Sequence, residues 1–173
     1  MVPRLAPLLL LACSTALALP KPGDEVRVVA VGELDGRERM LPDGPLPILV
    51  FYEDKDAGSQ NRHTRIAVGR YTDRPDNGDK FTFLPVADVE KWNWWPAKRY
   101  VFADVRKVAK ETQTTLLLDW KGAVRKAWGL RAGKSGVLLL APGGKVLFAG
   151  EGPLTEAQVA ELVARLEALG ARR

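Results

Sequence analysis

Apolar and polar positions alternate along the chain in blocks that predict an α/β fold. Residues 46–52 form a continuous apolar run rich in β-branched and aromatic side chains, as expected for a central strand buried on both faces. Shorter apolar runs predict further strands at 25–31, 81–89, 115–118, 137–140 and 145–149. Helices are predicted at 59–71 and 96–113, with a short helix ending near Gly129. Val101, Val105 and Val108 give the second helix one apolar face.

The last helix has the clearest start signal. Thr155 and Gln158 are spaced as a capping box, and apolar residues follow at helical spacing: Val159, Leu162, Val163, Leu166 and Leu169. This stripe is expected to pack on the sheet. Residues 141–144 read as the turn of a β-hairpin, and 32–45 as turns with a short hairpin or connector. No linker or repeat interrupts residues 22–170, which we interpret as one domain.

The N-terminal segment has the layout of an export signal. Arg4 precedes an apolar stretch too short to cross a bilayer, and Ala16-Leu17-Ala18 supplies a small-residue cleavage site. Residues 1–18 are therefore predicted to be a signal peptide, and the mature protein to be periplasmic or secreted. The alternative is a lipoprotein, in which residues 10–13 act as a lipobox and Cys13 carries the anchor. No other run approaches the roughly 20 apolar residues of a membrane helix.

Composition restricts the chemistry further. The 173 residues are 46% hydrophobic and 27% charged, enough for one domain with a real core. The formal net charge of +5 fits an ordinary basic surface, so we expect no nucleic-acid partner. There is one cysteine, Cys13, and one histidine, His63, which excludes disulfides and Cys/His metal sites from the mature chain.

The order of elements and several local motifs resemble a known superfamily. An Asp-x-x-Gly turn at Asp119, a short helix and a hairpin resemble the C-terminal half of the thioredoxin-like redoxins. Within it, the chain is most similar to the YtfJ-type exported proteins, through residues 117–119, 127–128, 137–140, 144–146 and 152–156. The resemblance implies a thioredoxin-like α/β fold with an N-terminal β extension, a central mixed sheet flanked by helices, and a C-terminal β-hairpin plus helix. It carries over no assigned activity.

The positions of redox chemistry hold other residues. In thioredoxins a Cys-x-x-Cys motif follows the first central strand and opens a helix, where the thiol pKa is lowered. Here Asp56 and Ser59 stand at the equivalent positions, and residues 134–136 replace the usual cis-proline. The fold is therefore expected without its usual activity.

The same turn is rich in acidic residues. Glu53, Asp54 and Asp56 follow a central strand, where ligands of α/β sheets commonly bind, and the last two begin a calcium-loop-like spacing. The remaining ligands of such a loop are missing. We expect a solvated acidic turn, with no metal and no cofactor.

The most unusual segment carries three tryptophans in four residues: Trp92, Trp94 and Trp95. They cannot all point into one core, so at least one is expected to be exposed. With Lys98 and Arg99 they form a candidate binding surface for an apolar side chain, a glycan ring or an acidic lipid head group. The alternative is that the rings cover the sheet edge and hold the following helix.

We therefore predict an exported thioredoxin-fold protein that lacks redox cysteines and acts as a binding or accessory module of the cell envelope. Its partner, a protein or a small molecule, is not identified by the sequence. Two alternatives remain open: a thioredoxin- or peroxiredoxin-like oxidoreductase with an antioxidant role that borrows a thiol, and an envelope module with a structural or membrane-surface role.

Overall fold

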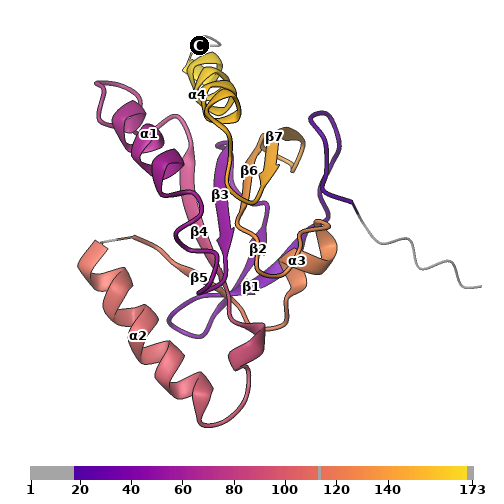
Figure 1. The fold of residues 1–173 in the computed structure, drawn as a ribbon, viewed down its shortest axis with the longest axis vertical. Helices are drawn as coiled ribbons and strands as arrows, with labels where there is room; N and C mark the ends of the chain where they lie inside the picture. The colour runs from indigo at the N-terminus through magenta and orange to yellow at the C-terminus, as the bar shows by residue number, and fades with distance from the viewer. Residues whose placement is uncertain (1–17, 113, 171–173) are drawn as a thin grey trace, which may run out of the picture.

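The computed structural model describes residues 18–112 and 114–170. One seven-stranded mixed sheet runs through it in the order β2-β1-β5-β4-β3-β6-β7 (Figure 1). The strands are β1 (Val29–Gly32), β2 (Glu38–Leu41), β3 (Ile48–Glu53), β4 (Thr82–Asp88), β5 (Leu117–Asp119), β6 (Gly136–Leu140) and β7 (Val146–Glu151). The helices are α1 (Arg62–Thr72), the single 3-10 turn η1 (Glu90–Trp92), α2 (Ala97–Thr112), α3 (Ala123–Ala127) and α4 (Glu156–Gly170).

Strand β3 lies at the centre, as its apolar run predicts. It pairs in parallel with β4 and antiparallel with β6, and β4 pairs in parallel with β5. Ile48, Val50 and Tyr52 enter the core on one face of the sheet, and Leu49 and Phe51 enter a second core on the other. All five side chains are buried, which explains why the run does not alternate with polar residues.

Helices cover both faces of the sheet. Val124 of α3, with Trp128 after it, packs into the first core, whereas α1 and α4 pack into the second. The predicted capping box of α4 is present: the Thr155 amide donates to Gln158 Oε1 at 2.9 Å, and the Gln158 amide donates to Thr155 Oγ1 at 3.3 Å. Leu162 and Leu166 are fully buried, so the apolar stripe packs on the sheet as expected.

Helix α2 is the exception to this close packing. Phe51 of the second core lines the space beneath it, so α2 lies on the same side of the sheet as α1 and α4. Its apolar face is nevertheless poorly covered, with Tyr100 68% and Val108 49% exposed. Phe102 stacks on Trp120 with ring centroids 5.8 Å apart, and Arg106 donates to the Leu34 carbonyl at 3.2 Å. These contacts fix the helix at one margin and leave the other margin open.

Most predicted element boundaries lie within two residues of the observed ones, and two starts differ by three or four residues. The strand predicted at 25–31 begins at Val29, because the preceding residues pair with the β6–β7 hairpin: the Val26 amide donates to the Gly144 carbonyl at 3.0 Å. The helix predicted from Ser59 begins at Arg62, because residues 55–61 form turns in which the Gln60 amide bonds the Ala57 carbonyl at 2.9 Å. The predicted signal peptide lies outside the described residues except for Ala18, and so does Cys13.

Candidate binding site

Acidic side chains end all three parallel strands at the same edge of the sheet. Glu53 ends β3, Asp88 ends β4 and Asp119 ends β5. Each is partnered internally. Glu53 pairs with Arg65 at 2.6 Å, Asp88 pairs with Arg125 at 3.1 Å, and Asp119 accepts the Val124 amide of α3 at 2.9 Å.

The loop after β3 carries Asp56 and Ser59, the two residues that the sequence predicts at the thiol positions of thioredoxins. Asp54 organises it, since its Oδ1 accepts the amides of Asp56 at 3.0 Å and Ala57 at 2.8 Å. The Asp56 side chain is 80% exposed and lies 3.8 Å from Lys91, and Ser59 is exposed as well. Both positions face solvent, so a thiol placed at either would be reachable by a disulfide.

A buried asparagine ties this loop to the rest of the sheet. Asn61 Nδ2 donates to Ser135 Oγ and to the Gly152 carbonyl, both at 2.9 Å. Its Oδ1 accepts the Leu154 amide at 2.9 Å. Ser135 occupies the position before β6 where the usual proline is absent, and it donates in turn to Glu53 Oε1 at 2.8 Å. Hydrogen bonds between side chains therefore join the loop after β3 to the segment before β6.

A second polar network lies on the α3 side. The Tyr52 hydroxyl donates to Asp119 Oδ2 at 3.1 Å. Burial raises the pKa of Tyr52, and the nearby charges of Asp119 and Asp88 raise it further, so the phenol stays neutral. The hydrogen bond from Lys126 lowers the pKa of Glu90, which also pairs with Arg125. These groups therefore have their hydrogen-bond and ion-pair partners within the protein.

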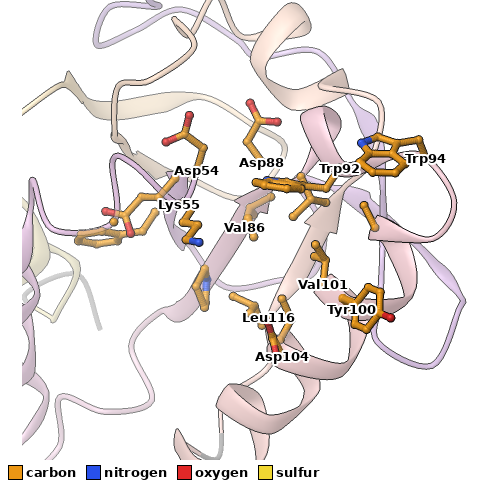
Figure 2. Close-up of a pocket in the computed structure, with 18 of the residues that line it drawn as sticks. Asp54, Lys55, Val86, Asp88, Trp92, Trp94, Tyr100, Val101, Asp104 and Leu116 are labelled. Carbon is orange, nitrogen blue, oxygen red and sulfur yellow. The ribbon is translucent and has the colours of Figure 1, made fainter.

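A large cleft opens between α2 and the sheet (Figure 2). Its volume is about 640 Å³, within the range of sites that hold a small molecule or a side chain of a partner. Phe51, Pro85 and Ala87 form the floor, and α2 contributes Val101 and Val105 to the wall. The cleft is thus an apolar channel beside the loop that carries Asp56 and Ser59.

The structure separates the three tryptophans of the candidate surface. Trp92 and Trp94 line one end of the cleft, as Figure 2 shows, and are 38% and 57% exposed. Trp95 is 83% exposed and lies instead with Lys98 and Arg99 along a different groove on α2. The prediction that at least one ring is exposed is confirmed. The five residues nevertheless belong to two surfaces: Trp92 and Trp94 line the cleft, whereas Trp95, Lys98 and Arg99 line the groove on the other side of α2.

Two charges at the cleft are not neutralised by the protein. Among the described residues, none forms a hydrogen bond or ion pair with the side chain of Lys55 or Asp104. Both line the cleft, Lys55 from the loop after β3 and Asp104 from α2 (Figure 2). Asp54, by comparison, lies 3.6 Å from the Lys91 ammonium. Lys55 and Asp104 are therefore the charges available to a polar group of an occupant.

Sequence reasoning missed most of this lining. It identified the apolar face of Val101 and Val105 but not that the face borders an open cleft. It also gave no reason to place Lys55 or Pro85 opposite that face, because the spacing of a helix reveals which residues share a side and not what lies across from it.

Comparison with known proteins confirms the resemblance inferred from the sequence. Residues 94–169 match the YtfJ_HI0045 family. Its members are bacterial proteins of unknown function. The matched segment of this family runs from Trp94 through α2, α3 and the hairpin into α4. No curated protein matches the chain.

Solved structures with the same fold include enzymes that act on thiols. A thiol peroxidase from Chromobacterium violaceum has a TM-score of 0.63 at 11% identity, covering 90% of this chain and 91% of its own. The thioredoxin domain of a thiol-disulfide oxidoreductase from Bacteroides vulgatus has a TM-score of 0.57 at 16% identity, covering 84% and 97%. A peroxiredoxin-like protein from Aquifex aeolicus has a TM-score of 0.56 at 14% identity, covering 87% and 88%. At these identities the similarity shows the thioredoxin-like fold alone.

The described residues offer neither a metal cluster nor a membrane-spanning helix. Within residues 18–112 and 114–170, no three His, Cys, Asp or Glu side chains gather closely enough to hold a metal ion. In the same part of the chain, no helix has both the length and the apolar character needed to span a bilayer.

Proposed function

We propose that this is an exported thioredoxin-fold protein that works by binding rather than by redox chemistry, and that its ligand site is the cleft beneath α2. The observation that carries the proposal is the cleft itself: an apolar volume of about 640 Å³ beside the loop that follows β3. Export rests on the predicted signal peptide at residues 1–18.

The arrangement of the loop favours binding over thiol chemistry. Asp56 and Ser59 stand where two cysteines would be needed, and neither can form a disulfide. Asp54, Asn61 and Ser135 hold the loop through hydrogen bonds that a catalytic dithiol does not require. Asp54 and Lys55 of the same loop line the cleft, and a few polar groups beside an apolar lining are typical of sites that orient a ligand.

The chemistry of the lining indicates the occupant. An apolar group fits over Phe51 and Pro85 and against Val101, while the indoles of Trp92 and Trp94 offer flat surfaces for stacking. Lys55 and Asp104 can each pair with one polar end of the occupant. The site thus suits an amphipathic small molecule, or an apolar side chain of an envelope protein.

Filling the cleft tests the proposal. Val101→Trp places a large ring in the channel, and Val28→Trp adds the same volume at a side chain that is 59% exposed and not part of the lining. Titration with the neutral fluorescent dye Nile red measures access to the cleft. We expect the wild type and Val28→Trp to bind the dye alike, and Val101→Trp to bind it at least tenfold more weakly, a loss of about 1.4 kcal/mol.

The proposal is wrong if Val101→Trp binds the dye like the wild type while circular dichroism shows both to be folded. A separate assay addresses the oxidoreductase alternative. Insulin reduction by the mature protein with only small-molecule reductant present should not exceed the buffer rate, and catalysis above that rate would favour an enzyme.

A further inference from the structure

Helix α2 carries a second surface that the cleft does not use. Its cleft face presents Val101, Asp104 and Val105, and its opposite face borders a shallow groove of about 460 Å³. The residues lining that groove are Trp95, Lys98, Arg99, Phe102, Ala103 and Arg106. We call this set the basic face of α2. It combines three cations with two aromatic rings, and none of its six residues is acidic.

The charge of the basic face is not balanced by neighbouring carboxylates. Helix α2 as a whole contains five Lys or Arg residues against two acidic ones, a net charge of +3. Of those two acids, Asp104 lines the cleft and Glu111 lies 4.0 Å from Lys107. Among the described residues, no hydrogen bond or ion pair involves the side chains of Arg99 and Lys110. The face therefore presents a positive field to solvent.

Aromatic rings hold two of the cations in place. The Lys98 ammonium lies 4.7 Å from the Trp120 ring centroid, and the Arg106 guanidinium lies 5.7 Å from that of Phe102. A cation fixed over a ring keeps its charge, and its side chain is already restricted to few rotamers before any ligand binds. Less conformational entropy remains to be lost when these groups meet an anion.

Trp95 is the feature that distinguishes the basic face from an ordinary charged helix. Its ring is 83% exposed, the highest value among the large apolar side chains of residues 18–112 and 114–170. An exposed indole beside Lys and Arg is the composition of segments that lie in the headgroup region of a bilayer, where the ring is buried and the cations meet lipid phosphates. Figure 1 places α2 at the outer edge of the fold, where a flat surface could reach it.

We propose that the basic face of α2, with Lys110 one turn beyond Arg106 on the same side of the helix, docks on an anionic phospholipid bilayer. Trp95 would enter the headgroup layer, and Arg99 and Lys110 would pair with lipid phosphates. This inference does not depend on the cleft or its occupant. It makes α2 the element by which the protein rests on a membrane surface, with the mouth of the cleft on the other side of the helix.

Vesicle sedimentation tests the proposal, with the mature protein purified from its native host. Vesicles of phosphatidylcholine alone are compared with vesicles of phosphatidylglycerol and phosphatidylcholine in equal parts, at low and at physiological ionic strength. We expect tighter binding to the anionic vesicles, weakened by salt. Each cation near an anionic surface changes partitioning about fivefold, so Arg99→Gln with Lys110→Gln should weaken it about twenty-fivefold.

Matched variants separate docking from general charge and from folding. Arg70→Gln with Lys145→Gln removes the same charge from exposed residues of α1 and the hairpin, and should bind within about twofold of the wild type. Trp95→Ala should weaken binding about tenfold, whereas Tyr100→Ala, which removes an exposed ring from the cleft face of the same helix, should not.

Several outcomes would overturn the proposal. One is equal partitioning of the wild type onto both kinds of vesicle. Another is that the control pair at Arg70 and Lys145 weakens binding to anionic vesicles as much as the pair at Arg99 and Lys110 does. A third is that Trp95→Ala binds anionic vesicles as tightly as the wild type. Binding to immobilised polyglutamate that depends on Arg99 and Lys110, without binding to anionic vesicles, would assign the basic face to an acidic protein instead.

Discussion

Asn61 should contribute more to stability than any exposed residue of the loop that it closes. Its side chain is fully buried and bonds three residues in two segments distant in sequence: Ser135 before β6, and Gly152 and Leu154 after β7. The perturbation is Asn61→Ala, which removes both the donor and the acceptor of the amide and leaves the backbone geometry of the turn unchanged.

The expected loss follows from the groups left behind. The Gly152 carbonyl and the Leu154 amide belong to buried residues, and in the variant both lose their side-chain partner. A buried polar group without a partner costs about 1 to 3 kcal/mol. Ser135 keeps its bond to Glu53 and adds little to the loss. The total is about 3 kcal/mol, and for a chain of this length it lowers the melting temperature by about 6 to 12 °C.

Urea unfolding measures this loss directly. Trp128 is 2% exposed, so its fluorescence should report the global transition. Asn93→Ala is the matched control. It removes an asparagine whose Nδ2 donates to the Trp120 carbonyl at 2.8 Å at an exposed site, where water can replace the bond, so it should cost less than about 0.5 kcal/mol.

This reasoning would be refuted if Asn61→Ala lowered the free energy of unfolding by less than about 1 kcal/mol while the slope of that free energy against urea concentration stayed unchanged. That result would mean that the amide is replaced at little cost by water or by the Thr64 hydroxyl, which donates to Asn61 Oδ1 at 3.3 Å in the wild type. Equal losses in the Asn61 and Asn93 variants would refute it too, since burial is the only difference that the argument uses.

Two further predictions concern the loop and the buried tyrosine. If Asp56 and Ser59 occupy the thiol positions of related folds, Asp56→Cys with Ser59→Cys should form an intrachain disulfide on mild oxidation, seen by mass spectrometry as the loss of two hydrogens. The control pair, Asp76→Cys with Asp79→Cys, should not form one. Two free thiols in the first pair would contradict the equivalence. Burial raises the pKa of Tyr52 above its ordinary value of 10.0, so ionisation of this phenol favours the unfolded chain. The contribution of the neutral hydroxyl to the free energy of unfolding is therefore complete below pH 10 and is lost as the pH rises further. Tyr52→Phe should therefore flatten the alkaline fall in unfolding free energy by up to about 1.4 kcal/mol per pH unit, and an unchanged slope would show that the hydroxyl is not held neutral.

The sequence predicted the elements better than their spatial relations. The run of residues 46–52 identified the central strand because burial on both faces leaves an unbroken apolar signal. The capping box of Thr155 identified the start of the last helix within one residue, because the cap is a local interaction. The sequence predicts a helix from Ser59, but the helix begins at Arg62. The hydrogen bonds of Asn61 to Ser135 and Leu154 join distant parts of the chain and leave no local signal in the sequence.

The candidate site shows the same division. The exposure of the tryptophans followed from their crowding in four residues, which is a local property. Their separation into a cleft and a groove did not, because it depends on where α2 begins and how far it stands from β4. Lys55 offered no local signal either, since it is one lysine in a charged turn.

The loose attachment of α2 also bears on how the molecule moves. The helix is fixed by the Phe102–Trp120 stack and the Arg106 bond to Leu34, whereas β3 is buried on both faces. Regions with few buried apolar contacts open more readily than the core, so the amides of α2 should exchange with solvent hydrogen while the sheet remains intact. Helix α2 would then open locally, and a ligand in the cleft or a membrane on the basic face would slow the hydrogen exchange of its amides.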